Sequence, residues 1–268
     1  MTPADPADLA LALALADRAD VLALASFRDV DLVVETKPDL TPVTEADRGV
    51  EAALRAVLAS ERPDDAVVGE EYGTSVGSSS RRRWVIDPID ATKNFVRGVP
   101  VWATLIALQV DEVGAVGVVS APALGRRWWA ARGQGAWAAA REGTGWEPGA
   151  PIHVSAVGRL EDALLSYAGI GGWVEVGRRD ELLALAARCW RTRGFGDFWS
   201  HVLVAEGACD IGLDPVVSLW DLAALQVIVE EAGGRFSDLS GQDRPDGGSA
   251  ISSNGRLHDQ ALAILSPR

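Results

Sequence analysis

The alternation of hydrophobic and polar residues predicts helices and strands in a mixed order along this chain. Residues 7–27 are rich in alanine and leucine and predict a helix. A second helix is expected over 45–60, because the aliphatic residues from Val50 to Leu58 fall on one face. Shorter apolar runs bounded by glycine and proline predict strands. We place these strands at 66–69, 84–86, 101–110, 114–120 and 127–132.

The best boundary between two halves of the chain lies within a segment rich in glycine and proline, residues 142–151. The helix expected over 218–231 has the clearest end, since Gly233 and Gly234 follow it. The mixed order of elements favours a layered α+β fold over a simple doubly wound sheet. We therefore expect one compact unit with two halves, 1–145 and 146–268. The other elements predicted here are strands near 163–167, 191–195 and 249–252, and helices at 178–189, 198–207 and 256–264.

Composition narrows the class of protein. Of 268 residues, 48% are hydrophobic and 24% are charged, which is the balance of a globular enzyme. The net charge of −13 argues against a nucleic-acid-binding protein, which needs a basic surface for phosphates. No apolar run reaches the ~20 residues of a membrane span, and acidic residues flank the short apolar stretch 9–16, unlike a secretion signal. Cys189 and Cys209 predict reduced thiols, and hence a cytoplasmic protein.

The segment 84–95 carries the candidate chemistry. An apolar strand is expected to stop at Pro88, with Asp87 and Asp90 on either side of it, and a helix is expected to begin at Thr92. Oxygen ligands can meet at such a strand end, and the free N–H groups of a helix N-terminus attract an anion. Clustered carboxylates repel one another unless cations neutralise them, and all-oxygen ligands suit Mg²⁺ first and Mn²⁺ second.

On their own, Asp87 and Asp90 could simply cap the following helix. However, Glu70 follows a predicted strand of its own, and Asp47 and Asp221 lie in the first turns of predicted helices. Five acids at element ends favour a metal-and-phosphate site over capping alone. A phosphatase of the haloacid dehalogenase type would need aspartates two positions apart rather than three, and no G-x-S-x-G hydrolase motif is present.

These motifs resemble the signature segments of the inositol monophosphatase superfamily. The resemblance implies a layered α-β-α-β-α sandwich of the inositol monophosphatase and fructose-1,6-bisphosphatase type. It also implies an Mg²⁺-dependent phosphomonoesterase that lithium inhibits, acting on a small phosphate ester as a homodimer. The matching segments span nearly the whole chain: 43–47, 69–71, 87–92, 220–224 and 230–234.

The resemblance also implies which residues hold the metals. Glu70, Asp87 and the Ile89 carbonyl would hold a first ion, and Asp87, Asp90 and Asp221 would hold a second. A third and weaker ion would lean on Glu70, so the expected number is two or three.

The same resemblance implies the catalytic and phosphate-binding groups. Asp47 would accept a hydrogen bond from Thr92, and this pair would orient the attacking water. With Glu70 they form the expected catalytic set. The N–H groups of Ala91 and Thr92 would bind the phosphate. The family usually has glycine where this chain has Ala91, and its methyl group is harmless only if the residue has a negative φ. We expect activity to survive.

Residues outside the metal motifs resemble the bacterial histidinol-phosphate phosphatases of this superfamily, over the segments 93–102, 117–132, 193–198 and 214–225. We therefore expect hydrolysis of L-histidinol phosphate, a step of histidine biosynthesis, by attack of a metal-activated water. The alternatives are inositol 1-phosphate or another small ester, and, less favoured, a non-catalytic binding protein.

The ammonium and imidazole of histidinol phosphate call for carboxylates and an aromatic wall. The candidates are Asp214, Asp197, Arg193 and Trp102. Three of them have another interpretation. Asp197 could cap the next helix, Asp214 could start a turn, and Trp102 could belong to the core.

Overall fold

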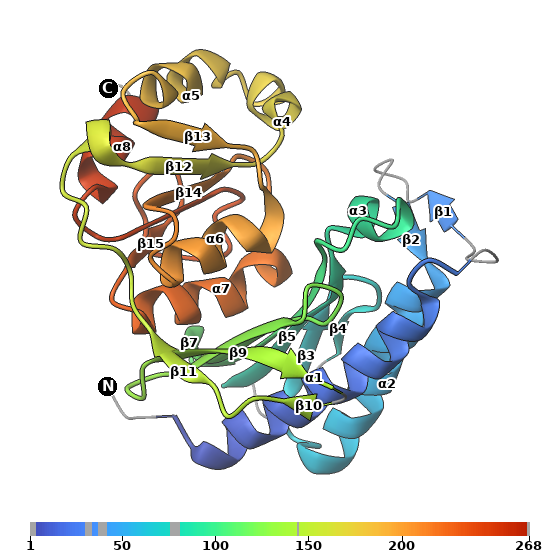
Figure 1. Cartoon of the computed structure of the whole chain (residues 1–268). Coiled ribbons are helices and arrows are strands. Elements are labelled where there is room, and N and C mark those ends of the chain that lie inside the picture. The colour runs from blue at the N-terminus through green and yellow to red at the C-terminus, as the bar shows by residue number, and fades with distance from the viewer. Residues whose placement is uncertain (1–3, 30–33, 37–41, 76–80, 144, 267–268) are drawn as a thin grey trace.

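Five layers, alternately helical and stranded, build the computed structural model of this protein (Figure 1). The structure describes residues 4–29, 34–36, 42–75, 81–143 and 145–266. Its helices are α1 (Pro6–Ser26), α2 (Glu45–Glu61), α3 (Thr92–Val96), α4 (Ile170–Glu175), α5 (Arg179–Ala186), α6 (Asp197–Ala205), α7 (Leu219–Glu231) and α8 (His258–Leu265). They include none that is long and apolar enough to cross a membrane.

The first sheet has nine strands in the order β10-β9-β8-β7-β6-β5-β3-β4, with β11 also paired to β9. Its strands are β3 (Ala66–Gly69), β4 (Gly73–Ser75), β5 (Arg82–Asp90), β6 (Ala103–Val110), β7 (Val113–Ala121), β8 (Arg126–Ala131), β9 (Ala136–Glu142), β10 (Gly145–Trp146) and β11 (Ala150–Ile152). Among the described strands of this sheet, β3 and β5 are the one parallel pair. They run in the same direction because β4, which lies between them in the sequence, runs back antiparallel to β3.

The second sheet has five strands in the order β13-β12-β14-β16-β15. The strand β12 is parallel to both of its neighbours, and β16 is antiparallel to both of its own. A separate antiparallel pair, β1 (Val34–Thr36) with β2 (Pro42–Thr44), leads into α2. The strands of the second sheet are β12 (Leu164–Tyr167), β13 (Arg191–Arg193), β14 (Ile211–Asp214), β15 (Arg235–Ser237) and β16 (Ala250–Ser253).

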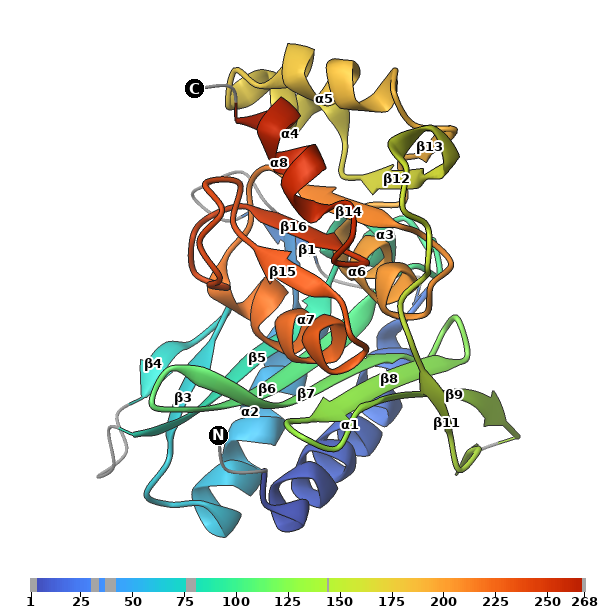
Figure 2. The same ribbon diagram turned by 90° about the vertical axis from the view of Figure 1, so that its left-hand side faces the viewer.

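Three hydrophobic cores hold the layers together. One lies between the first sheet and the pair α1 and α2, with Leu15, Leu54 and Ile106 fully buried in it. The next joins the other face of that sheet to α6 and α7, and the last lies between the second sheet and α4, α5 and α8. Figures 1 and 2 show α6 and α7 between the two sheets. This order confirms the predicted α-β-α-β-α sandwich.

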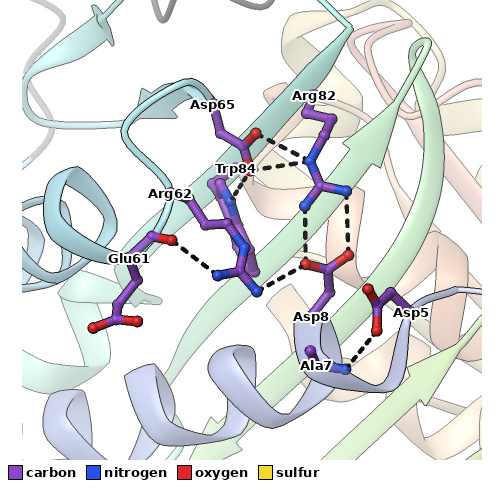
Figure 3. A network of polar contacts seen from close by, with 8 residues as sticks. All are labelled: Asp5, Ala7, Asp8, Glu61, Arg62, Asp65, Arg82 and Trp84. Atoms are coloured by element: carbon purple, nitrogen blue, oxygen red, sulfur yellow. Dashed lines mark hydrogen bonds and ion pairs between the residues drawn. The ribbon is translucent and has the colours of Figure 1, made fainter.

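A polar network fixes the N-terminal helix α1 to the first sheet (Figure 3). Asp8 on α1 is 4% exposed and accepts hydrogen bonds from Arg82 on β5, one of them at 2.9 Å. Arg82 also contacts Asp65 at 3.0 Å, and Asp65 in turn accepts from the Trp84 indole at 2.9 Å. Burial of these charges is tolerated because each of them has a partner. Arg82 is thus occupied by structural contacts.

The boundaries of several elements differ from the sequence-based expectation. The strand β5 does not stop at Pro88 but continues to Asp90, because an irregularity in its pairing with β6 accommodates the proline. Several elements were not predicted at all: the strands β1, β2, β4, β9, β10, β11, β14 and β15 and the helix α4. Most of them are short or lack clear apolar periodicity, and tertiary packing stabilises such segments more than local pattern does.

Candidate active site

A bulge in β5 creates the turn on which the site is built. Asp87 pairs with Leu105 of β6, and Asp90 pairs with Ala103. Between these two pairs, β5 therefore contains one more residue than β6. Pro88 has no N–H group, so the irregular pairing leaves no donor without an acceptor at this residue. The Pro88 carbonyl accepts a hydrogen bond from the buried Thr104 hydroxyl at 2.8 Å. The extra residue bends the strand and brings both aspartates to one side.

Three carboxylates from distant parts of the sequence meet at this bulge. Oxygen atoms of Asp87, Asp90 and Asp221 all lie within 4.8 Å of one another. Asp221 comes from the first turn of α7, where it accepts the Ser218 N–H at 2.6 Å and so completes a capping box. Asp90 accepts the N–H of Phe198, in the first turn of α6, at 2.9 Å. The N-terminal ends of α6 and α7 therefore both contribute to the cluster.

Glu70 lies close to Asp87 because of the strand register. In the parallel pair of β3 and β5, Gly69 is opposite Ile86, so the next residues of the two strands are neighbours. The Glu70 N–H donates to the Ile86 carbonyl at 3.3 Å. The sequence predicted that these acids meet, and a parallel sheet edge provides the physical reason.

The electrostatics of the cluster suit a bound cation. Burial raises the pKa of Asp87 well above its usual range, and the nearby Glu70, Asp90 and Asp221 raise it further. Burial likewise raises the pKa of Asp90, with added repulsion from Asp197 and Asp221. It raises the pKa of Asp221 to about 7, although the Ser218 N–H opposes the rise. Uncompensated acids of this kind, with only hard oxygen donors, fit a divalent cation such as Mg²⁺.

Asp47 and Thr92 form a second polar group beside the cluster. Asp47 is fully buried at the third position of α2, where the N–H and hydroxyl of Thr44 donate to it in a capping box. The Thr92 hydroxyl lies 3.4 Å from Asp47 Oδ1 and 3.0 Å from the Ile89 carbonyl. Burial raises the pKa of Asp47, and Glu70 adds to the rise. A hydroxyl held between two acceptors can turn a lone pair toward a water molecule.

Ala91 adopts the conformation that the sequence analysis named as the unfavourable one. It has φ 65° and ψ 46° and is the N-cap residue of α3. This is the left-handed region, which glycine adopts freely and a residue with a Cβ does not. The methyl group is therefore held in a strained position directly next to Thr92.

Two of the predicted specificity residues lie near the cluster. Asp214 at the end of β14 is 3% exposed, and its Oδ2 lies 2.8 Å from His201 Nε2. Asp197 begins α6 with a positive φ of 49°. Burial raises the pKa of Asp197 to about 6, with a further contribution from Asp214, while Lys93 and His201 oppose the rise. Asp197, Asp214 and Lys93 thus form a charged group next to Asp90.

The other two specificity candidates have different contacts in the structure. Trp102 is fully buried, and its ring packs against Phe27 and Phe95 at centroid distances of 5.3 and 5.0 Å. The expectation that Trp102 packs against substrate was therefore wrong, because a ring with no exposed surface belongs to the core. Arg193 lies on the edge strand β13, and its guanidinium donates to the Thr192 carbonyl at 2.8 Å.

His201 was assigned no role by the sequence analysis. It is fully buried on α6, between the Ser252 hydroxyl at Nδ1 and Asp214 at Nε2, each at 2.8 Å. The imidazole fixes the orientation of the Asp214 carboxylate. Its position one helical turn after Asp197, on an otherwise apolar face, was the only signal in the sequence.

A layered sandwich with an acidic cluster at a strand end is the architecture of metal-dependent phosphatases. The sequence model of the inositol monophosphatase family matches residues 7–267, and the chain belongs to this family. It is thus a phosphoric monoester hydrolase, as the motifs predicted.

Individual relatives are similar over almost their full length. The histidinol-phosphatase of Mycobacterium tuberculosis is 55% identical over 261 residues, which are 96% of this chain and 97% of that protein. The histidinol-phosphatase of Streptomyces coelicolor is 52% identical and covers 97% of each chain. Among solved structures, the extragenic suppressor protein suhB from Bartonella henselae superposes with a TM-score of 0.86 at 27% identity, covering 97% of this chain and 99% of that one.

Proposed function

We propose that this protein hydrolyses L-histidinol phosphate to L-histidinol and phosphate in histidine biosynthesis. The observation that carries the chemistry is the convergence of Asp87, Asp90 and Asp221 within 4.8 Å, at a bulge next to the Asp47–Thr92 pair. The choice of substrate is supported by two relatives that are named histidinol-phosphatases and are 55% and 52% identical to this chain.

The carboxylates form the proposed metal-binding residues. Glu70, Asp87 and the Ile89 carbonyl would hold one Mg²⁺, and Asp87, Asp90 and Asp221 a second. A third ion near Glu70, and Mn²⁺ in place of Mg²⁺, are part of the same proposal. Bound Mg²⁺ would lower the pKa of a water molecule and offset negative charge on the phosphate.

Protein groups carry the rest of the mechanism. The Thr92 hydroxyl orients the attacking water. As the water passes a proton to the Thr92 oxygen, Thr92 passes its own proton to the buried Asp47 carboxylate behind it. The water oxygen bonds to phosphorus as the ester P–O bond breaks, and the leaving alkoxide takes a proton from a solvent water molecule to become the histidinol hydroxyl. The N–H groups of Ala91 and Thr92 hold the phosphate.

We assign substrate specificity to acidic residues from the C-terminal half of the chain. Asp214 and Asp197 would face the ammonium and imidazole of the substrate, with Arg193 as a further candidate. Both aspartates lie close to Asp90, where a phosphate ester bound to the metals would extend its alcohol portion. We also propose that the halves 1–145 and 146–268 work as one unit, in a homodimer. The free thiols Cys189 and Cys209 are consistent with a cytoplasmic enzyme.

A substrate panel with and without Mg²⁺ tests the proposal. Phosphate release from L-histidinol phosphate, inositol 1-phosphate and p-nitrophenyl phosphate is compared at matched enzyme concentration. We expect activity to vanish in chelator and to return with Mg²⁺, and kcat/KM to be highest for L-histidinol phosphate. A value no better than that for inositol 1-phosphate would contradict the substrate assignment. Absence of any Mg²⁺-dependent release would favour a non-catalytic protein.

A further inference from the structure

A second acid on α2, one turn after Asp47, is fully buried without belonging to the carboxylate cluster. Glu51 has a side-chain exposure of 0%. Residues four apart lie on the same face of a helix, so the same face that presents Asp47 to Thr92 also presents Glu51. A buried carboxylate is costly unless donors satisfy it, so its partners indicate what it is for.

The partners of Glu51 are backbone N–H groups of the segment that carries Glu70. Glu51 Oε2 accepts the Glu71 N–H at 2.7 Å, and Oε1 accepts the Tyr72 N–H at 3.2 Å. These are the two residues directly after Glu70, in the turn between β3 and β4. Hydrogen bonds from backbone N–H groups to an ionised acceptor are stronger than bonds between neutral groups. One side chain of α2 thereby fastens both of these amides.

Arg55, one further turn along α2, braces the same turn. Its Nε donates to Glu51 Oε1 at 2.7 Å, and its Nη2 donates to the Gly73 carbonyl. Its other amino group lies 3.2 Å from the Ser75 hydroxyl. The pair Glu51–Arg55 therefore holds N–H groups at one side of the turn and a carbonyl at the other. Arg55 also supplies the charge that makes burial of Glu51 tolerable.

Gly69 shows how closely Glu51 approaches the turn. A Cβ atom built on Gly69 would lie 2.0 Å from Glu51 Oε1, far inside contact distance. Gly69 has an ordinary negative-φ backbone, so the glycine is required by space and not by conformation. The residue before Glu70 is thus kept small so that the Glu51 carboxylate can sit against the strand end.

We infer that Glu51 is a positioning residue that holds the Glu70 turn in the geometry needed to bind Mg²⁺. The inference rests on the proposed role of Glu70 as a metal ligand. The rigid helix α2 then sets the position of Asp47 directly and that of Glu70 through Glu51, so the water-orienting acid and the metal ligand keep a fixed separation. Removing a residue that holds a metal ligand in place typically changes metal affinity by roughly 10–100-fold.

The test compares Glu51→Gln with Asp20→Asn as a matched control. Asp20 is also a buried acid paired with an arginine, Arg127, but it joins α1 to β8 away from the Glu70 turn. Both carboxylate oxygens of Glu51 accept hydrogen bonds, from the Glu71 N–H, the Tyr72 N–H and Arg55. In Glu51→Gln an NH₂ group replaces one of these oxygens, so at least one of the three donors loses its acceptor. We expect both variants to lose thermal stability without metal. Only Glu51→Gln should raise the Kd for Mg²⁺ in a calorimetric titration without substrate, by roughly 10-fold or more.

Amide hydrogen exchange supplies a readout that does not depend on metal binding. The amides of Glu71 and Tyr72 should exchange faster in Glu51→Gln than in the wild type, and at unchanged rates in Asp20→Asn. If Glu51→Gln does not fold, Arg55→Gln serves instead, because it removes the brace from a partly exposed position. Its expected effect is the same in direction and smaller.

The outcomes separate the inference from the proposed function. A wild type that binds Mg²⁺ and hydrolyses a phosphate ester, together with a Glu51→Gln variant of unchanged Mg²⁺ affinity, would overturn the inference alone. A wild type that neither binds Mg²⁺ nor hydrolyses any ester would overturn the proposed function, and the positioning role with it. Weaker Mg²⁺ binding with faster exchange at both amides, seen in Glu51→Gln and absent from Asp20→Asn, would support it.

Discussion

Replacing Ala91 with glycine should make this protein more stable, although the same replacement usually does the opposite. Ala91 has φ 65° and ψ 46°. An L-residue in this left-handed region costs about 1–2 kcal/mol relative to the right-handed one. Glycine removes that strain, but its greater backbone entropy stabilises the unfolded chain by roughly 0.5–1 kcal/mol. The difference predicts a net stabilisation of roughly 0.5–1 kcal/mol for Ala91→Gly.

The assay is urea or thermal unfolding of the metal-free protein, and Ala52→Gly is the control. Ala52 is exposed in the middle of α2, so there glycine only adds entropy and should destabilise by about 0.5–1 kcal/mol. Ala91→Gly should raise Tm by about 1–3 °C, the shift expected for a domain of this size. Equal destabilisation by both variants would refute the argument that φ at Ala91 is strained.

Three further predictions concern the carboxylates. Asp90→Asn should lower kcat on the order of 10²-fold, in steady-state assays at saturating Mg²⁺, and an unchanged kcat at limiting Mg²⁺ would contradict the metal assignment. Asp214→Ala should raise KM for L-histidinol phosphate roughly tenfold, with little change for p-nitrophenyl phosphate; equal changes would remove Asp214 from the specificity site. In chelator, Tm should fall as pH rises from 5.5 to 8. The pKa of Asp221 is about 7 in the folded protein and about 4 in the unfolded chain. Between these two values the folded protein binds a proton that the unfolded chain has lost, so raising the pH removes this stabilisation. Added Mg²⁺ should reverse the fall at pH 8, and a Tm independent of pH in chelator would refute the linkage.

Local motifs allowed much of the site to be predicted from the sequence. Asp87 and Asp90 are three residues apart, and one bulge suffices to bring them together. Asp47 and Asp221 each hold the third position of a helix, which a capping residue three positions earlier indicates. Such signals lie within a few residues and do not depend on the rest of the fold.

Residues whose role depends on tertiary contacts could not be predicted in this way. Trp102 carries no local sign of whether it faces substrate or the aromatic cluster of Phe27 and Phe95. Glu51 and His201 were not assigned a role because their partners, the Glu71 amide and the Asp214 carboxylate, are 20 and 13 residues away. The sequence showed only that each of them is a polar residue on an apolar helix face. This pattern did not indicate which residue would be its partner.

The way the C-terminal half reaches the cluster explains why the ester is harder to infer than the chemistry. The middle layer of the sandwich contributes through the first turns of α6 and α7, with the Phe198 N–H on Asp90 and with Asp221 itself. Helix N-termini carry partial positive charge, so both helices ease the crowding of carboxylates. Asp197 stands at the same end of α6, directly before Phe198. The Phe198 N–H bond to Asp90 therefore ties the start of α6, where the proposed specificity residue Asp197 stands, to the carboxylate cluster. Side chains around Asp197 and Asp214 can change while that bond, which any residue at position 198 except proline can make, keeps the cluster intact.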